Sequence, residues 1–423
     1  MKAEIIAIGS ELLTPYRLDT NSLYLTSELN GVGVRVVHKA VVGDAPEEMC
    51  SSFAHALDRA DLVVSCGGLG PTDDDRTRQT VADLLGRRLY CDEGILEKIR
   101  ERFRRFGRSM PEINARQALV IEGATVLPNP KGTAPGQWIE AKGHIIVLLP
   151  GVPHELRALM ETEVKSRLSR LAIRERLFTR DLRISGLFES DVEQRVSPLY
   201  AAYPETDTTI LATARGIELH PSIWSSDTGK AEKTLDEMVA RMALALGENL
   251  FSAHGESIEE IVAKILAENQ ATIAVAESCT GGLLAERITT MPGSSAYFLG
   301  GVVCYSNELK ATLVGVPAEM IAAKGAVSEE VALALADGIR KRTGATIGVG
   351  ITGIAGPNGG TPEKPVGLVH IGIADERAPR QRKFQLPGDR ERIRNFAALN
   401  ALDMVRRHFL FPAIGPAGAI GRS

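Results

Sequence analysis

The sequence predicts an α/β protein of several domains. Short apolar runs rich in β-branched residues alternate with amphipathic segments up to about residue 170, and the alternation returns after residue 255. Between these regions, strand patterns follow one another without crossover helices. Because domains average about 150 residues, a chain of 423 residues should contain two or three. We expect two α/β domains, the first with a mainly parallel sheet covered on both faces, and a small α+β domain between them.

In the first domain, residues 1–170, four strand patterns alternate with four helical segments. Strand patterns cover residues 3–8, 35–42, 61–66 and 145–149, and helical spacing covers residues 21–29, 46–58, 77–85 and 153–168. Ligands of open parallel sheets bind at the carboxyl ends of the strands. The loops at those ends are therefore the first candidates for a functional site.

Three of these loops contain residues suited to an anion or a cation: residues 9–21, 67–77 and 149–155. The glycines of the second loop could wrap a phosphate, although the loop has neither the P-loop Lys-Ser/Thr nor the dinucleotide spacing. Asp73, Asp74 and Asp75 would repel a phosphate there unless a cation such as Mg²⁺ lay between them. Alternatively, these aspartates only favour the N-terminus of the following helix.

The middle segment, residues 171–253, reads as the α+β domain. Strands are predicted over residues 177–185, 208–214 and 216–224, and helices over residues 189–199 and 230–246. The third domain, residues 254–411, should contain helices over 258–268, 283–288, 308–314, 328–343 and 389–409, and strands over 271–276, 299–305, 345–351, 366–374 and 380–386. Residues 412–423, rich in Gly, Pro and Ala, form a tail that we expect to be disordered.

The turn over residues 276–282 places a hydroxyl and a thiol side by side between a strand and a helix. Two glycines and a helix N-terminus there could stabilise an anion or an oxyanion. Ser278 or Thr280 could instead be no more than the helix N-cap. If the turn is catalytic, Ser278 and a desolvated Lys310 are sufficient as a nucleophile and its base. In the competing interpretation, Cys279 is the nucleophile and acts with Glu277 and Lys310.

Composition excludes several classes of protein. A formal charge of −4 gives no general attraction to nucleic acid, and the arginine-rich segment, residues 98–108, reads as one solvated helix face. No apolar stretch reaches the roughly 18 residues of a membrane span. Five scattered cysteines and no room for a signal peptide lead us to expect a cytoplasmic protein with reduced thiols.

The loops of the first domain resemble those of the CinA family of competence/damage-inducible proteins, in the motifs at residues 67–72, 129–136 and 149–155 together with Glu11 and residues 19–21. The resemblance implies a molybdopterin-binding-like fold and an ADP-ribose pyrophosphatase that uses Mg²⁺ or Co²⁺. It implies nucleotide-binding residues Glu11, Asn21, Gly67, Gly68, Gly70, Pro71, Thr72, Gly151 and Glu155, and metal ligands Asp74, Asp75 and Glu11.

The last domain is similar to the CinA carboxy-terminal domain, which also occurs as a separate nicotinamide mononucleotide (NMN) deamidase, in the motifs at residues 276–289, 300–310, 325–332 and 348–360. This resemblance implies Ser278 as nucleophile and Lys310 as general base, assisted by Tyr305. It implies that Thr352 and Gly353 hold the amide or its oxyanion, and that Arg392, with Gly281 and Gly282, binds the substrate phosphate. No cofactor is implied for this domain.

The middle domain would then be KH-like, but it lacks the GXXG loop with which KH modules bind nucleic acid, so a spacer or dimerisation role in a homodimer is expected. The predicted function is hydrolysis of NMN to nicotinate mononucleotide and ammonia, with cleavage of ADP-ribose in the first domain, as part of pyridine nucleotide salvage. Two alternatives stay open: a non-catalytic pterin- or nucleotide-binding module, and a partner protein in competence or DNA repair.

Overall fold

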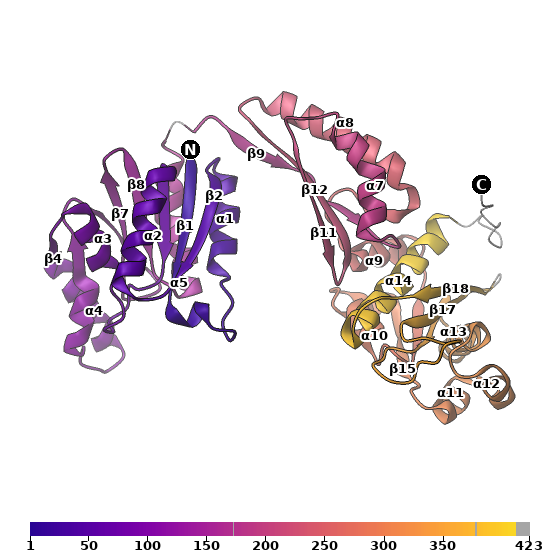
Figure 1. Ribbon diagram of the computed structural model, residues 1–423. Coiled ribbons are helices and arrows are strands. Elements are labelled where there is room, and N and C mark those ends of the chain that lie inside the picture. Colours follow the sequence, from indigo (N-terminus) through magenta and orange to yellow (C-terminus); the bar gives the residue numbers. More distant parts are fainter. Residues whose placement is uncertain (172, 377–378, 412–423) are drawn as a thin grey trace. The chain divides into compact units, whose positions relative to one another are not determined.

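The computed structural model describes residues 1–171, 173–376 and 379–411, so the predicted disordered tail lies outside the described residues. The chain divides into two compact units. One contains residues 1–178 and 224–231, and the other contains residues 179–223 and 232 onward. Each unit is described by itself (Figure 1).

A six-stranded sheet of order β2-β1-β3-β8-β7-β6 forms the centre of the first unit. β1 (Lys2–Ile8), β2 (Arg35–Val42), β3 (Leu62–Cys66) and β8 (His144–Leu149) are parallel, and they are the four predicted strands. β7 (Gly136–Ala141) and β6 (Thr125–Leu127) add antiparallel strands at one edge. The carboxyl ends of β1, β3 and β8 therefore lie next to one another.

Helices cover both faces of this sheet (Figure 1). Along β1, Ile5 and Ala7 pack in the core that includes α1 (Asn21–Gly31) and α5 (Pro153–Leu159). Ile6 and Ile8 point the other way, into the core that includes α2 (Pro46–Arg59) and α3 (Thr77–Leu85). Successive side chains of a strand alternate between faces, so a β1 that is apolar from Ile5 to Ile8 must be covered on both faces. The predicted three-layer α/β architecture is confirmed.

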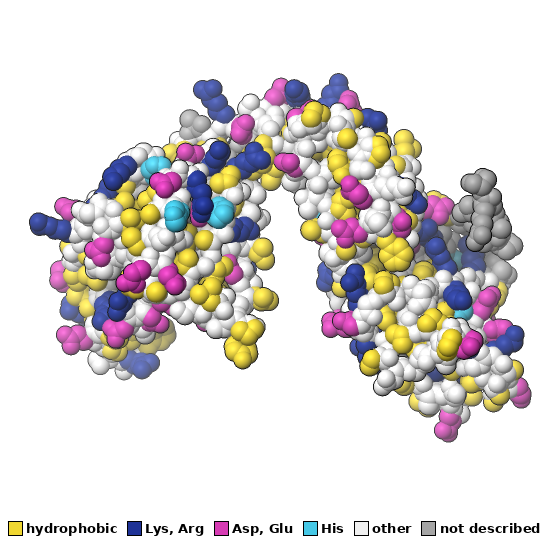
Figure 2. Space-filling view, in the orientation of Figure 1, with side chains coloured by type: hydrophobic (Ala, Val, Ile, Leu, Met, Phe, Trp, Pro, Cys, Tyr) yellow, Lys and Arg dark blue, Asp and Glu magenta, His cyan; other side chains and the backbone are white. Residues whose placement is uncertain are grey.

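The segment after α3 forms a small satellite of this unit. β4 (Leu89–Cys91) pairs with β5 (Leu119–Ile121), and α4 (Glu93–Arg105) packs on a 3₁₀ helix, Glu112–Ala118. Arg100 and Arg104 on α4 both form ion pairs with Glu97, which fits the predicted solvated face. Figure 2 likewise shows charges of both signs interspersed over the visible surface.

The helix predicted over residues 153–168 is not continuous. α5 ends at Leu159, a π-helical turn spans Met160–Val164, and α6 (Lys165–Leu168) follows. Met160 and Val164 are buried in this π turn, so the buried face of the segment stays apolar through it. The spacing of apolar residues alone therefore could not reveal the turn.

The second unit contains the antiparallel sheet of the middle segment, with order β11-β12-β10-β13. Its strands are β10 (Leu182–Ile184), β11 (Asp207–Thr213), β12 (Gly216–Ser225) and β13 (Leu250–Ser252), and its helices are α7 (Glu189–Tyr200) and α8 (Thr228–Leu246). The strand predicted over residues 177–185 is in fact two, β9 (Arg176–Thr179) and β10.

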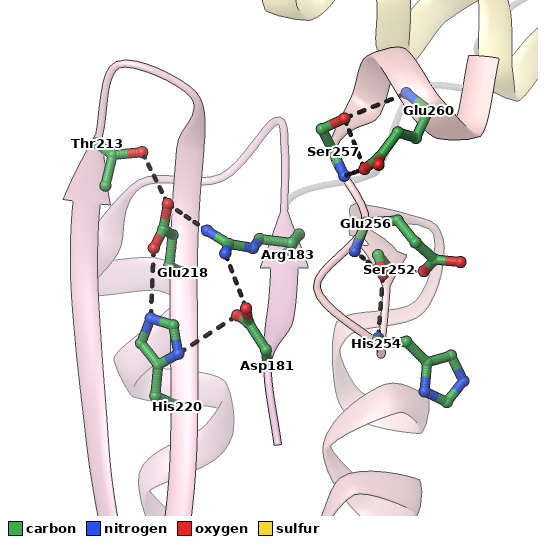
Figure 3. A network of polar contacts seen from close by, with 10 residues as sticks. All are labelled: Asp181, Arg183, Thr213, Glu218, His220, Ser252, His254, Glu256, Ser257 and Glu260. Carbon is green, nitrogen blue, oxygen red and sulfur yellow. Dashed lines mark hydrogen bonds and ion pairs between the residues drawn. The ribbon is translucent and has the colours of Figure 1, made fainter. Parts of the chain in front are cut away.

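A polar network fixes the register of β10 against β12 (Figure 3). Arg183 pairs directly with Glu218 across the strands and also lies 2.8 Å from Asp181 Oδ2. His220 lies 3.3 Å from both carboxylates. Cross-strand charge pairs of this kind favour one alignment over a slipped one. Figure 3 also shows the capping box of Ser257 and Glu260 that starts α9 (Ile258–Glu268).

The C-terminal sheet has the order β15-β14-β16-β17-β18. β14 (Ile273–Glu277), β15 (Phe298–Val303) and β16 (Ile347–Gly353) are parallel, and β17 (Leu368–Ala374) and β18 (Arg380–Gln385) continue antiparallel. One core contains α9, α10 (Leu283–Thr289) and α14 (Arg390–Leu410), and the core on the other face contains α13 (Glu329–Thr343).

Two shorter helices, α11 (Asn307–Val314) and α12 (Ala318–Lys324), complete this domain. Ser328 caps α13 by accepting from the Val331 N–H. Gly350 lets α13 approach β16 closely, because a Cβ there would come within 2.4 Å of the Ala332 carbonyl oxygen. None of the helices in the described ranges combines the length and apolarity that crossing a lipid bilayer requires.

Candidate active site

Ser278 lies on the turn between β14 and α10, at the carboxyl end of a central parallel strand. Its backbone N–H donates to the Ile351 carbonyl of β16, so the turn is attached to the neighbouring strand. The residue is 9% exposed, which leaves it enclosed but reachable. This is the position at which open α/β sheets bind ligands.

Lys310, in the first turn of α11, brings its amine to Ser278. Lys310 Nζ lies 3.1 Å from Ser278 Oγ, and it donates to the Cys304 and Tyr305 carbonyl oxygens at 3.0 and 3.1 Å. The residue is 1% exposed, and its burial lowers its pKa. The structure thus brings together the predicted Ser278 and Lys310, which are 32 residues apart.

The three oxygens around Lys310 Nζ suit a base. A neutral amine has two N–H bonds and one lone pair, so the two carbonyls can accept both hydrogens while the lone pair faces the Ser278 hydroxyl. After taking a proton, the ammonium has three donors for the same three oxygens. Both protonation states are therefore satisfied without movement of the side chain.

Cys279, the competing nucleophile, is buried in the hydrophobic core. The residue is 5% exposed and packs with the apolar residues of the core that contains α9 and α14. Burial raises the pKa of its thiol to about 12. Because the thiolate is the reactive form of cysteine, the geometry favours Ser278 over Cys279.

Glu277 closes the N-terminus of α10, a role that the sequence did not suggest. Its carboxylate, 1% exposed, accepts from the backbone N–H groups of Gly282, Leu284 and Ala285 at 2.8 to 3.0 Å. The N-cap residue is Gly282, so the interpretation of Ser278 or Thr280 as a helix cap is wrong.

This cap also corrects the role expected of the two glycines. The Gly282 N–H is bonded to Glu277, and the Gly281 N–H donates to the Ser278 carbonyl. Neither N–H can bind a substrate phosphate in this arrangement.

Two other N–H groups of the turn are free. Within the described part of the chain, the backbone N–H groups of Cys279 and Thr280 have no acceptor. They belong to the two residues that follow Ser278. In hydrolases with a strand–turn–helix nucleophile, the N–H of the residue after the nucleophile helps to hold the oxyanion of the substrate. Sequence reasoning had assigned this role to the helix N-terminus, because it could not show that Glu277 occupies those donors.

The second glycine-rich turn adjoins the first. Thr352, near the end of β16, is 1% exposed and its hydroxyl donates to the Ala326 carbonyl at 2.7 Å, so the side chain is directed into the protein. Gly353 is packed against β17, where a Cβ would come within 2.8 Å of the Leu368 carbonyl oxygen. Both residues position the turn beside Ser278, and their predicted contact with the amide stays a prediction.

Two arginines of α14 reach the site, and Arg392 is not one of them. Arg394 donates twice to the Thr280 carbonyl, at 3.1 and 2.7 Å. Arg390 donates to the Gly356 carbonyl at 2.8 Å and to the Tyr305 hydroxyl at 3.0 Å. Residues 390 and 394 share one helix face, whereas a residue two positions along points about 200° away.

Tyr305 and Arg392 therefore lie differently from what the resemblance implies. The Tyr305 side chain is 57% exposed and contacts Arg390, and it is the Tyr305 carbonyl that contacts Lys310. Arg392 lies over the Phe396 ring, 5.4 Å from its centroid, on the face away from Arg390. The geometry makes Arg390 and Arg394 better candidates for a phosphate.

The predicted loops of the first unit also meet. Asn21 Nδ2 donates to the Gly151 carbonyl at 2.8 Å, and the Gly67 N–H donates to the Leu149 carbonyl. Gly67 and Gly151 are in close approach, because a Cβ on Gly151 would lie 3.3 Å from Gly67 Cα. Glu155 accepts from Asn129 Nδ2 at 2.6 Å. These residues occupy one sheet edge, as predicted from the parallel topology.

The loop after β3 is held from within by Asp75. Its carboxylate accepts from the Gly70 N–H at 2.7 Å, and from the Thr72 N–H and hydroxyl at 2.9 and 2.6 Å. Below the loop, Arg78 is 3% exposed and donates to the Leu69 carbonyl, and burial lowers its pKa to about 10. Nothing in the sequence distinguished Arg78, which is the second residue of the amphipathic helix α3.

The predicted metal ligands Asp74, Asp75 and Glu11 do not form a preformed metal-binding site. Both oxygens of Asp75 are already hydrogen-bonded, while Asp74 and Glu11 are exposed. No group of three His, Cys, Asp or Glu side chains suited to a metal ion occurs in the residues that the structure describes. The side chains present do not fit a resident ion.

Comparison with known proteins gives two family matches. Residues 4–170 match the model described as "Probable molybdopterin binding domain", and residues 255–409 match the "CinA C-terminal domain". A CinA-like protein of Koribacter versatilis is 49% identical over 97% of this chain and 100% of its own length. A CinA-like protein of Solibacter usitatus is 46% identical over 96% of this chain and 98% of its own length.

Among solved structures, the chain is similar to the competence/damage inducible protein CihA of Agrobacterium tumefaciens, with 38% identity over 35% of this chain and 93% of that one, at a TM-score of 0.34. The two matched regions contain the first and the last predicted domain, in that order. The chain belongs to the CinA family.

Proposed function

We propose that the C-terminal domain hydrolyses the carboxamide of NMN, giving nicotinate mononucleotide and ammonia. The observation that supports this most is the 3.1 Å contact between Lys310 Nζ and Ser278 Oγ at an enclosed strand–helix turn. A buried amine with a lowered pKa beside a serine hydroxyl is a nucleophile and its base. The resemblance to NMN deamidases supplies the substrate.

In the proposed reaction, Lys310 Nζ takes the Ser278 proton while Ser278 Oγ attacks the amide carbon. The oxyanion accepts hydrogen bonds from the Cys279 and Thr280 N–H groups, each worth roughly 3 kcal/mol. The C–N bond then breaks, the Lys310 ammonium protonates the departing nitrogen, and ammonia leaves a Ser278 ester. Water, deprotonated by the same amine, cleaves the ester and restores both groups.

The substrate phosphate would bind at the guanidinium groups of Arg390 and Arg394. An arginine fork matches phosphate geometry, and the two side chains extend from one face of α14 toward residues of both glycine turns. Binding the phosphate there would place the amide at a fixed distance from Ser278, so orientation would contribute to the rate.

The test of this function is product formation from NMN by the purified full chain. Equimolar ammonia and nicotinate mononucleotide are expected, and none from the Ser278→Ala variant. Release of free nicotinamide instead would mean cleavage of the glycosidic bond and would overturn the proposal.

For the first unit we propose ADP-ribose pyrophosphatase activity with added Mg²⁺ or Co²⁺. The convergence of Asn21, Gly67 and Gly151 on one sheet edge favours a nucleotide there. A cation would have to be held largely by phosphate oxygens, since Asp75 is engaged within its loop. Release of AMP from ADP-ribose tests this. Tight binding of ADP-ribose without AMP release would instead identify a non-catalytic binding module.

A further inference from the structure

A cavity of about 890 Å³ lies between the middle sheet and the C-terminal domain, both in the second unit. Its wall includes β10, β11 and β12 on one side and β18 and α14 on the other. Ser278, Lys310 and Thr352 do not belong to this wall. Ligand pockets typically measure roughly 300–1,000 Å³, so the cavity can hold a molecule of substantial size.

One wall presents two guanidinium groups, each beside a phenyl ring. Arg382 on β18 lies 5.3 Å from the Phe384 ring centroid, and Arg392 on α14 lies 5.4 Å from that of Phe396. In the described part of the chain, neither arginine forms an ion pair with an acidic side chain. Two uncompensated positive charges at the edge of an apolar cavity favour an anionic ligand.

The opposite wall is acidic and partly apolar. Glu189 and Glu193 of α7 line it, and so does Phe188, which is 59% exposed. Between the walls, Ile184, Leu386 and Leu399 form a buried apolar floor. Carboxylates accept hydrogen bonds but do not donate them, so this wall suits a ligand with hydroxyl or amino donors.

From this arrangement we propose that the cavity is a second nucleotide-binding site, distinct from the Ser278 centre. The phosphate would lie against Arg382 and Arg392, since arginine forks match phosphate oxygens. The base would lie on the exposed Phe188 ring, because aromatic stacking is favourable for any base. Ribose hydroxyl and amino groups would face Glu189 and Glu193.

The charge distribution discriminates against other occupants. An acyl chain with an anionic head could use the apolar floor and one arginine, but it would leave Glu189 and Glu193 facing hydrocarbon. A nucleotide satisfies the cationic wall, the aromatic rings and the carboxylates together. The site does not depend on the deamidase reaction, because none of its lining residues takes part in it.

Photolabelling with 8-azidoadenosine 5′-monophosphate tests the site directly in the full chain. Mass spectrometry should find label on peptides from residues 184–193 or 382–387, which exclude Arg390 and Arg394, and unlabelled AMP should compete for it. Adenosine, which has no phosphate, should compete at least tenfold more weakly. Label confined to other parts of the chain, or adenosine competing as well as AMP, would overturn the proposal.

A matched pair of variants supports the assignment. Arg382→Gln combined with Arg392→Gln should abolish labelling of these peptides, whereas Lys264→Gln combined with Lys341→Gln removes the same charge outside the cavity and should leave it intact. Both double variants replace exposed side chains, so their circular dichroism spectra should match that of the wild type. Equal labelling of the two double variants would contradict a phosphate contact at the arginines.

Discussion

Lys310 determines whether Ser278 can act, because only a neutral amine accepts the serine proton. Burial lowers the pKa of Lys310, so the base form should be available below the ordinary lysine value of about 10.4. The rate of ammonia release should rise with pH and reach its plateau below that value. A plot of kcat/KM against pH measures this, and a rate still rising above it would contradict the assignment.

A permanent cation at the same position should remove the base. The Lys310→Arg variant keeps the charge but cannot lose its proton at accessible pH, and general-base catalysis is typically worth on the order of 10²–10⁴ in rate. A loss of that size is expected in kcat. Near-normal activity of Lys310→Arg would show that proton transfer does not involve this residue.

Cys279 should be chemically inert despite its position next to the nucleophile. Its thiol is buried and its pKa is raised to about 12, whereas Cys91 is exposed. Iodoacetamide at pH 8 should therefore alkylate Cys91 and leave Cys279 unmodified in the native protein, as followed by peptide mass spectrometry. Equal rates at the two thiols would mean that the turn opens.

At the scale of elements, α10 depends on Glu277 for its start. Glu277→Ala would leave three N–H groups without their acceptor, at a cost of about 2–4 kcal/mol in the free energy of unfolding. Glu286→Ala on the exposed side of the same helix should change that free energy by no more than about 0.5 kcal/mol. Urea unfolding of both variants measures the difference, and equal values would show that Glu277 is not the cap.

α14 provides the test of phosphate binding. Arg390→Gln and Arg394→Gln should each raise KM for NMN about tenfold or more, since both side chains reach the site. With nicotinamide riboside, which has no phosphate, the KM of the same variants should differ little from that of the wild type. If Arg392→Gln raises KM for NMN more than Arg390→Gln or Arg394→Gln does, Arg392 binds the phosphate, as the sequence implied, and the assignment to Arg390 and Arg394 is wrong.

Sequence patterns predicted α14 to within a residue of its start but not which of its faces meets the site. Three arginines occur in five positions, and the choice among them depends on the angle at which the helix packs on the sheet. The role of Glu277 could not be predicted either, because it depends on where the backbone N–H groups at the start of α10 lie. By contrast, Ser278 and Lys310 could be paired beforehand, because both follow strands whose parallel ends must be neighbours.

For the molecule as a whole, the order of strands and helices and the parallel cores followed from apolar periodicity. The short strands β4, β5, β6 and β13 did not, because three residues show too little alternation to be recognised. The strand β7 and the helix α12 were also not predicted. Asp75 was misjudged for a different reason: three adjacent aspartates look alike in sequence, and only the folded loop turns one of them inward.

The two proposed activities should respond differently to a chelator. EDTA should leave ammonia release from NMN unchanged, since the Ser278 mechanism uses only protein groups, and it should abolish AMP release from ADP-ribose until Mg²⁺ or Co²⁺ is added back. Coupled assays on one preparation measure both. Loss of the deamidase activity with EDTA would contradict the mechanism derived for Ser278 and Lys310.

The most direct measurement is the rate of ammonia release from NMN by wild type, Ser278→Ala, Cys279→Ala and Lys310→Ala. Ser278 and Lys310 form the contact at the centre of the mechanism, while Cys279 is packed in the core. We expect Ser278→Ala and Lys310→Ala to be inactive and Cys279→Ala to retain most of the activity. An inactive Cys279→Ala together with an active Ser278→Ala would contradict the account.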